Sequence, residues 1–223
     1  MGSKNKLKRF RENETFSNVI QPERKEVIDG FSLKGNWHTH FKNNNPIILE
    51  LGCGKGEYTI ALARKNPNIN YIGIDLKGAR FWRGAKTALE ENLTNVAFIR
   101  TQIELIDLLF NENEVAEIWI TFPDPQIKYT RTKHRLTNTE FLKKYQHVLV
   151  PDGIIHLKTD SEFMHGYTLG LLHGEGHEIL YAHHDIYKNF FTPKEVTSTQ
   201  TFYESQYLEK DKPITYIKFR LKY

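Results

Sequence analysis

A glycine-rich segment in the first half of the chain has the residue types of a nucleoside-binding loop. It reads Glu50-Leu51-Gly52-Cys53-Gly54-Lys55-Gly56, and it follows an apolar run at 47–51. Glycines let the backbone turn sharply and let a ligand approach closely, and a helix N-terminus after such a loop offers free amide donors. Asp75 ends the next apolar run, 19 residues after Gly56. A carboxylate there can accept hydrogen bonds from both hydroxyls of an adenosine ribose.

The spacing of these glycines separates two classes of cofactor. The dinucleotide fingerprint is GxGxxG, whereas this loop has GxGxG, and Glu57 occupies the third glycine position of the fingerprint. Glu50 and Glu57 would repel a pyrophosphate, but two acids suit the sulfonium and ammonium charges of S-adenosylmethionine. We therefore expect S-adenosylmethionine as the cofactor rather than a nicotinamide dinucleotide. The structural alternative is an ordinary strand-to-helix turn.

A second group of reactive residues follows the apolar run at 115–122. It reads Phe122-Pro123-Asp124-Pro125-Gln126-Ile127-Lys128, and it leads into a basic run with Arg131, Lys133 and Arg135. Prolines on both sides restrict the backbone around Asp124. Its carboxylate can hydrogen-bond the N1–H and N2 edge of a guanine, and the basic side chains beside it can hold the phosphates of a nucleic acid.

Alternating strands and helices are needed to bring these residues together. Apolar runs typical of strands occur at 47–51, 71–74, 96–99, 115–122, 154–157, 178–182 and 214–221. Helical patterns lie between them, one opening with the capping-box sequence Thr137-Asn138-Thr139-Glu140. We expect a Rossmann-like α/β fold with a mostly parallel, seven-stranded sheet and helices on both faces. Ligands bind such sheets beyond the carboxyl ends of the strands, where Glu50, Asp75, Gln102, Asp124 and Asp160 lie.

The distribution of charge points to a polyanionic partner. The 223 residues include 31 Lys and Arg and 27 Asp and Glu, a net charge of +4. Residues 1–25 contain seven basic and three acidic residues, so the whole excess lies there. We expect residues 1–45 to form a polar, irregular and flexible basic arm, and residues 46–223 to form one methyltransferase domain. Such clusters fit nucleic acid, although they also occur as solvated surface.

Several classes of protein are excluded by what the sequence lacks. No apolar stretch is long enough to cross a bilayer, and the basic N-terminus has no apolar core of a secretory signal. The single cysteine, Cys53, excludes an intramolecular disulfide and a CxxC zinc site. The ten histidines do not show the spacing of a metal site. We therefore expect a soluble cytoplasmic protein without a bound metal.

The motifs, taken in order, resemble the tRNA (guanine-N7)-methyltransferase family of bacteria. The resemblance rests on Thr121 to Lys128 with the basic run after it, on Leu136-Thr137 leading to Glu140-Phe141-Leu142, on Lys158-Thr159-Asp160, and on Thr201-Phe202-Tyr203-Glu204. It extends from about residue 47 to the C-terminus. Several residues depart from the family pattern. Gln126 replaces a tryptophan after the Asp-Pro pair, Arg131 replaces a histidine, and Gln102 lies where the family usually has an acidic residue. In the basic run, His134 takes an arginine position, and uncharged residues stand where the family often has Lys, Arg or Asn: Tyr129, Thr130 and Thr132.

The resemblance implies transfer of a methyl group from S-adenosylmethionine to N7 of guanine 46 in the variable loop of tRNA. It implies that Asp124 is the catalytic residue and also contacts the cofactor. The other cofactor contacts implied are Glu50, Gly52, Gly54, Gly56, Asp75 and Gln102. The substrate contacts implied are Lys128, Arg131, Asp160, Thr201, Phe202, Tyr203 and Glu204. We expect a monomer or homodimer that binds tRNA and needs no partner protein.

The chemistry of this reaction is consistent with the residues. Guanine N7 has an in-plane lone pair and no proton, so the reaction needs in-line placement rather than a strong base. Methylation makes the purine cationic, and a nearby carboxylate stabilises that charge. Two alternatives stay open. One is another Rossmann-fold methyltransferase acting on an RNA amine or a small molecule, and the other is a non-catalytic RNA-binding module.

Overall fold

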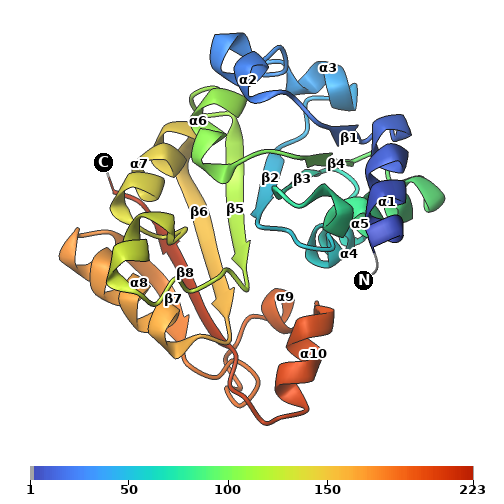
Figure 1. The fold of residues 1–223 in the computed structure, drawn as a ribbon. Helices are drawn as coiled ribbons and strands as arrows, with labels where there is room; N and C mark the ends of the chain where they lie inside the picture. The colour runs from blue at the N-terminus through green and yellow to red at the C-terminus, as the bar shows by residue number, and fades with distance from the viewer. Residues whose placement is uncertain (1–2, 223) are drawn as a thin grey trace.

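The apolar runs of the sequence lie side by side in one sheet of the computed structural model, which describes residues 3–222 (Figure 1). Among these residues the sheet has eight strands in the order β1-β4-β3-β2-β5-β6-β8-β7. The strands are β1 (Val19–Ile20), β2 (Ile47–Leu51), β3 (Asn70–Ile74), β4 (Val96–Ile99), β5 (Val115–Thr121), β6 (Leu149–Thr159), β7 (Glu178–His183) and β8 (Thr215–Arg220). Neighbouring strands are parallel, except that β8 runs antiparallel to β6 and β7. The expected Rossmann-like α/β class is confirmed.

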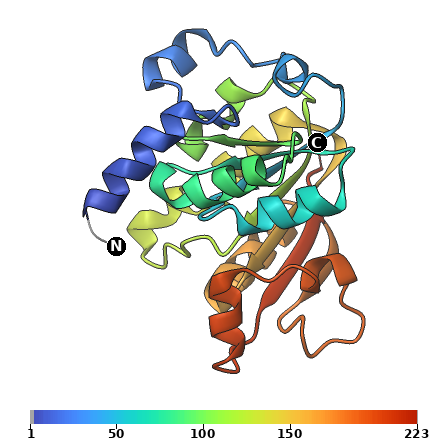
Figure 2. The same cartoon turned by 90° about the vertical axis from the view of Figure 1, so that its right-hand side faces the viewer.

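Helices cover both faces of the sheet because its central strands are apolar on both sides (Figure 2). In β2, Leu49 and Leu51 belong to one core layer and Ile48 to the other, as expected for parallel strands without a solvated face. The helices are α1 (Ser3–Thr15), α2 (Arg24–Gly30), α3 (Trp37–Phe41), α4 (Glu57–Lys65), α5 (Gly78–Glu90), α6 (Ile106–Leu109), α7 (Thr139–Val148), α8 (Glu162–Gly174), α9 (Lys194–Thr197) and α10 (Phe202–Leu208), with 3₁₀ turns η1 (Ile103–Leu105) and η2 (Tyr129–His134). None of the described helices is long and apolar enough to span a membrane.

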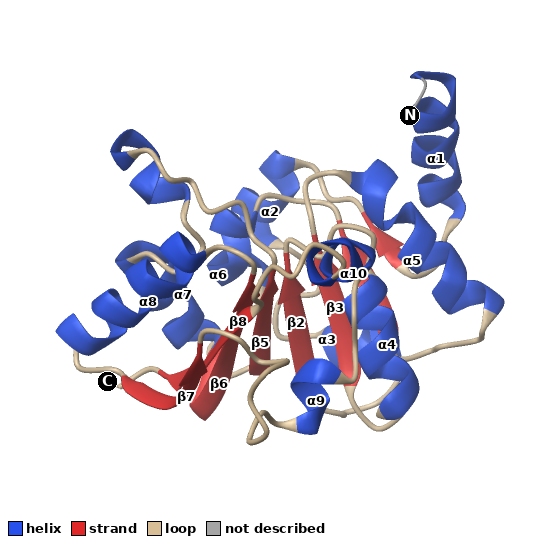
Figure 3. Cartoon of the chain, turned by 90° about the horizontal axis from the view of Figure 1, so that it is seen from below, coloured by secondary structure: helices blue, strands red, loops and turns tan. Residues whose placement is uncertain are grey.

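The order of the strands places a switch point at the centre of the sheet. From β2 the chain continues to β3 and β4 on one side, and it then returns to β5 and β6 on the other side. Ligands of such sheets bind where the connections diverge, beyond the carboxyl ends of the strands. Figures 1 and 3 show α10 beyond these ends, so a C-terminal segment lies next to the switch point.

The N-terminal segment differs from the irregular segment expected from its polar composition. Helix α1 packs along α5, where the Asn13 side chain donates to the Gly78 carbonyl at 2.9 Å. Strand β1 pairs with β4 and is the strand by which the sheet exceeds the predicted seven. Four apolar side chains anchor the rest of the segment in the core, although they are too widely spaced to form a periodic pattern: Val27, Phe31, Trp37 and Phe41. Residues 1 and 2 lie outside the described residues, and the boundary at residue 45 stays a prediction.

One predicted helix start is wrong by one residue. Asn138, not Thr137, is the N-cap of α7, and its side chain accepts a hydrogen bond from the Phe141 N–H at 2.9 Å. The Thr137 hydroxyl lies 2.7 Å from that of Thr168 instead. Tertiary packing therefore replaces the local capping box that the sequence predicts.

Candidate active site

The glycine-rich loop joins β2 to α4 and depends on three glycines in the left-handed region. Gly52, Gly54 and Gly56 have φ angles of 75°, 56° and 73°, which strain any residue with a Cβ. A Cβ added to Gly56 would lie 2.6 Å from the ring of Phe98, whereas one added to Gly52 would meet nothing within 4 Å. The loop is therefore tightly packed against the sheet at Gly56 and open to a ligand at Gly52.

Asp75 faces this loop from the end of β3. Its Oδ2 accepts a hydrogen bond from the Gly54 N–H at 3.0 Å, and its Oδ1 accepts one from the Lys77 N–H at 2.7 Å. These bonds fix the carboxylate and leave further lone pairs on both oxygens. Asp75 and Gly52 line a cavity of about 320 Å³, whose wall also includes Leu76, Thr101, Gln102 and Ile103. A carboxylate, an open glycine and apolar side chains in one cavity fit a nucleoside.

Gln102 borders the same cavity from the turn after β4. Its side-chain carbonyl accepts a hydrogen bond from Arg24, which follows β1. The N-terminal segment thus contacts a residue of this wall, which the sequence does not indicate.

Glu50 lies beneath the loop and is buried rather than open to this cavity. Its Oε2 accepts hydrogen bonds from the Thr59 N–H at 2.8 Å and the Thr59 hydroxyl at 2.5 Å, and its Oε1 accepts one from Thr121 at 2.6 Å. Burial raises the pKa of Glu50 to about 7, against the opposing effect of these hydrogen bonds. In this structure Glu50 connects α4 to β5.

Asp124 is exposed in the turn that follows β5. Its Oδ1 accepts a hydrogen bond from the Gln126 N–H at 3.2 Å. Phe122 and Gln126, on either side of the Pro-Asp-Pro sequence, have φ angles of +49° and +47°. Left-handed conformations are uncommon for residues other than glycine, and they concentrate at functional sites. The strained residues thus flank Asp124, and the turn holds it in a defined position.

The surroundings of Asp124 connect to those of Asp75. Asp124, Lys128 and Arg131 line a cavity of about 450 Å³. Gln126 and Arg131 also line the cavity at Asp75, so the two spaces are neighbours. Lys128 and Arg131 are exposed and form no ion pair with any described residue. A cofactor at Asp75 and a polyanionic substrate at Asp124 could thus meet at the strand ends.

Arg135 differs from the other cations of the basic run because it is only 6% exposed. Its Nε donates to the Gln126 carbonyl at 3.1 Å, and its Nη2 donates to the Ile127 carbonyl at 3.2 Å. Its guanidinium carbon lies 4.4 Å from the ring centroid of Tyr167 and 4.8 Å from that of Phe163. The sequence suggests a phosphate ligand here, and that interpretation is wrong. Arg135 instead fixes the backbone next to Asp124.

The segment from Thr201 to Glu204 reaches the site from the C-terminal part of the chain. The Glu204 N–H donates to the Thr201 hydroxyl at 3.2 Å, and the Thr201 N–H donates to Glu204 Oε2 at 3.3 Å, which forms the capping box of α10. Phe202 and Tyr203 between them are 50% and 48% exposed. The Phe202 N–H also donates to Glu57 Oε2 at 2.9 Å. The segment therefore lies against the start of α4, next to the glycine loop.

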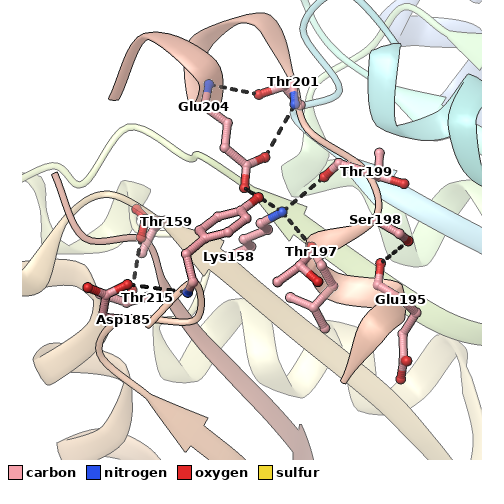
Figure 4. Close-up of polar contacts among 12 residues, drawn as sticks. Lys158, Thr159, Asp185, Glu195, Thr197, Ser198, Thr199, Thr201, Glu204 and Thr215 are labelled. Carbon is pink, nitrogen blue, oxygen red and sulfur yellow. Dashed lines mark hydrogen bonds and ion pairs between the residues drawn. The ribbon is translucent and has the colours of Figure 1, made fainter. Parts of the chain in front are cut away.

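A buried ion pair lies beneath this segment (Figure 4). Lys158 Nζ is 2.6 Å from Glu204 Oε1, and both side chains are fully buried. The same amine donates to the carbonyls of Val196 at 2.7 Å and Thr199 at 3.1 Å, and the Tyr187 hydroxyl donates to Glu204 at 2.8 Å. Burial lowers the pKa of Lys158, and the charge of Glu204 opposes this. Lys158 thus fastens α9 and α10 to the end of β6.

Most of the predicted site residues therefore meet at one edge of the sheet. Asp160 also lies there, half-buried, with its Oδ2 3.5 Å from Lys212 Nζ. Glu50 and Glu204 are present but buried among protein partners. Arg135 and Lys158 support the site without a sequence signal for that role, because their burial depends on contacts with distant elements. The described residues contain no group of three or more His, Cys, Asp or Glu that could hold a metal.

Comparison with known proteins gives several matches. The family described as "Putative methyltransferase" matches residues 44–217. A tRNA (guanine-N(7)-)-methyltransferase of Christiangramia forsetii is 76% identical over 224 residues, covering 100% of each chain. One of Porphyromonas gingivalis is 50% identical, covering 93% of this chain and 86% of the relative. The solved 16S rRNA methyltransferase KamB has a TM-score of 0.63 at 13% identity, over 85% of this chain and 94% of that one, which shows the shared fold.

Proposed function

This chain belongs to the tRNA (guanine-N7)-methyltransferase family, and we propose that it methylates guanine N7 in tRNA through the residues at the switch point of its sheet. The products are 7-methylguanosine in the tRNA and S-adenosylhomocysteine. The observation that carries the assignment of the site is the adjacency of two cavities. Gln126 and Arg131 form part of the wall of both the Asp75 cavity and the Asp124 cavity.

The cavity at Asp75 is the place proposed for the cofactor. Asp75 would accept hydrogen bonds from the ribose hydroxyls, Gln102 would lie beside the adenine, and Gly52 would allow close approach. Gly54 and Gly56 shape the loop that borders the cavity. Glu50 acts from beneath, by its hydrogen bonds to Thr59 and Thr121 rather than by direct contact. S-adenosylmethionine, when bound, supplies a methyl group on a positively charged sulfur.

Asp124 is the residue proposed to act on the target base. Its exposed carboxylate would accept hydrogen bonds from guanine N1–H and N2–H, which selects guanine over adenine. The same negative charge stabilises the purine as it becomes cationic. The chain does not have to remove a proton from N7, so its main contribution is to hold the base in line.

The surrounding side chains are proposed to hold the RNA. Lys128 and Arg131 are exposed cations suited to phosphates, and Phe202 and Tyr203 are half-exposed rings suited to stacking on an extruded base. Asp160 lies at the same edge. Thr201 and Glu204 would act by positioning these two rings. We further propose that the target is guanine 46, and that the protein acts in the cytoplasm without a partner protein, as a monomer or homodimer.

The test is a methyl-transfer assay with labelled S-adenosylmethionine and unmodified bulk tRNA, followed by digestion and identification of the labelled nucleoside. We expect 7-methylguanosine, and no label in a tRNA transcript whose guanine 46 is replaced by adenine. Another methylated nucleoside would mean that Asp124 reads a different base. Cofactor binding without transfer to tRNA would contradict the proposed substrate.

A further inference from the structure

A third cavity, beside the proposed cofactor and guanine sites, lies between α1, α5 and the glycine loop. It has a volume of about 850 Å³. Helix α1 is fixed to α5 on this side, because the Trp82 indole donates to Glu12 at 2.6 Å and the Arg9 guanidinium lies 4.5 Å from the Trp82 ring centroid. The cavity therefore exists only because the N-terminal segment is folded onto the domain.

The wall of this cavity is strongly basic. Seven basic side chains and one acidic side chain line it. Besides Arg9, the basic ones are Lys6, Lys55, Lys77, Arg80, Arg83 and Arg100. The acid is Glu57, which is already engaged with the Phe202 N–H and lies 3.8 Å from Lys55. The positive charge of the cavity is therefore not neutralised by its own wall.

Four of these cations have no acidic partner within the described part of the chain. Lys6, Lys77, Arg80 and Arg100 are all exposed, and none of them forms an ion pair there. The Arg100 guanidinium carbon lies 4.7 Å from the Phe10 ring centroid, so an aromatic contact, not a carboxylate, orients it. Exposed cations held by aromatic rings remain available to bind phosphate oxygens.

The cavity is continuous with the proposed RNA site. Tyr203 and Lys55 line it, and the Lys55 ammonium lies 3.9 Å from the Phe202 ring centroid and 5.6 Å from that of Tyr203. Leu76, 55% exposed, adds apolar surface to the same wall. A strand whose target base lies near Asp124 could thus pass over these rings into the basic cavity.

We propose that this cavity is a second binding track for the RNA backbone, formed by α1, α5 and the glycine loop. The occupant is the phosphate chain of the same RNA molecule that presents the target guanine, so the inference rests on the proposed function. The track contacts phosphates without reading bases, and it adds counterion release to the affinity. It also gives two of the seven basic residues of the segment 1–25, Lys6 and Arg9, a defined place in the folded protein.

The experiment compares tRNA binding across a range of salt concentrations, in the presence of S-adenosylhomocysteine, for two double variants of the full chain. Arg80→Gln with Arg100→Gln removes two cations of the track. Lys42→Gln with Lys222→Gln removes two exposed cations that do not line the cavity. Thermal unfolding and S-adenosylhomocysteine affinity are measured for both variants, to show that each is folded and binds the cofactor product.

We expect the magnitude of the negative slope of log K against log salt concentration to decrease by about 1.5 in the track variant, because each lost phosphate contact removes about 0.7–0.9 from that magnitude. The control should keep the wild-type slope. Equal slopes in both variants would overturn the track. This result is also expected if the cavity binds an acidic peptide instead of RNA. Failure of the proposed function would give a different result from failure of the track. The wild-type protein would then bind tRNA through the track without forming 7-methylguanosine.

Discussion

The buried guanidinium of Arg135 holds the backbone carbonyl of Gln126, two residues from Asp124, at 3.1 Å. A second bond to the Ile127 carbonyl makes the contact bidentate. Gln126 has a left-handed backbone and lines both cavities of the site. Arg135 therefore supports the strained turn from below, and it is a positioning residue rather than a ligand of the substrate.

Arg135→Lys should lower kcat about tenfold or more, because an ammonium cannot replace the planar fork of a guanidinium and small displacements at a reacting centre are costly. The salt dependence of tRNA binding should stay unchanged, since Arg135 is buried. Arg131→Gln is the matched control. It should instead reduce the magnitude of the negative slope of log K for tRNA against log salt concentration. Steady-state kinetics and salt titrations of both variants provide the check. A reduced slope with normal kcat in Arg135→Lys would identify a phosphate contact.

Asp124→Asn should reduce methyl transfer by a factor of about 100 to 1,000, as for loss of one group that stabilises transition-state charge. The amide oxygen can still accept the Gln126 N–H, so the turn should keep its conformation. Affinity for S-adenosylhomocysteine, measured by calorimetry, should change little. Loss of that affinity in a variant of native stability would assign Asp124 to the cofactor rather than to the base.

Lys158→Met should destabilise the protein by about 3–5 kcal/mol, because it leaves the carboxylate of Glu204 buried without its partner. The double variant Lys158→Met with Glu204→Leu should recover much of this loss, since two apolar side chains replace both charges. Urea unfolding of the wild type, both single variants and the double variant measures the coupling. Additive losses would show that the two charges do not interact in solution.

Glu50 should make stability fall as pH rises from about 4.5 to 7. Its pKa is raised in the folded protein. Between these pH values the folded state retains a proton that the unfolded state releases. The free energy of unfolding therefore decreases as the pH rises. The contribution is on the order of 1–3 kcal/mol. Glu50→Gln should remove this dependence, as measured by urea unfolding at pH 5 and pH 8. Its persistence in Glu50→Gln would assign it to another group.

The strands and the site loops were predictable from sequence for a physical reason. Parallel strands buried on both faces need continuous apolar runs, which are easy to recognise. The residue that follows each such strand must then lie at the same edge of the sheet, so Asp75, Asp124 and Asp160 could be placed near one another. The Gly52, Gly54 and Gly56 pattern was recognisable because positive φ angles favour glycine.

The N-terminal segment was not predictable in the same way. Its apolar residues, such as Phe31 and Trp37, are isolated in the sequence and form no periodic pattern. Their burial is evident only from the core in which they pack. The capping-box pattern was misleading at 137–140 and unrecognised at 201–204, where it forms. A four-residue pattern is compatible with several structures, and packing against distant elements selects among them.

By itself, the sequence determined the fold class, the glycine loop, the acidic residues at the strand ends and the excess of positive charge. Local conformational preference and hydrophobic periodicity depend on residues that are close together in the sequence, so they can be interpreted one segment at a time. Only the tertiary structure decided that Arg135 supports a loop, that Glu204 is paired with Lys158, and that α1 completes a basic cavity. Whether a charged side chain meets solvent, substrate or a buried partner depends on residues far away in the chain, and only the folded chain brings those residues into contact.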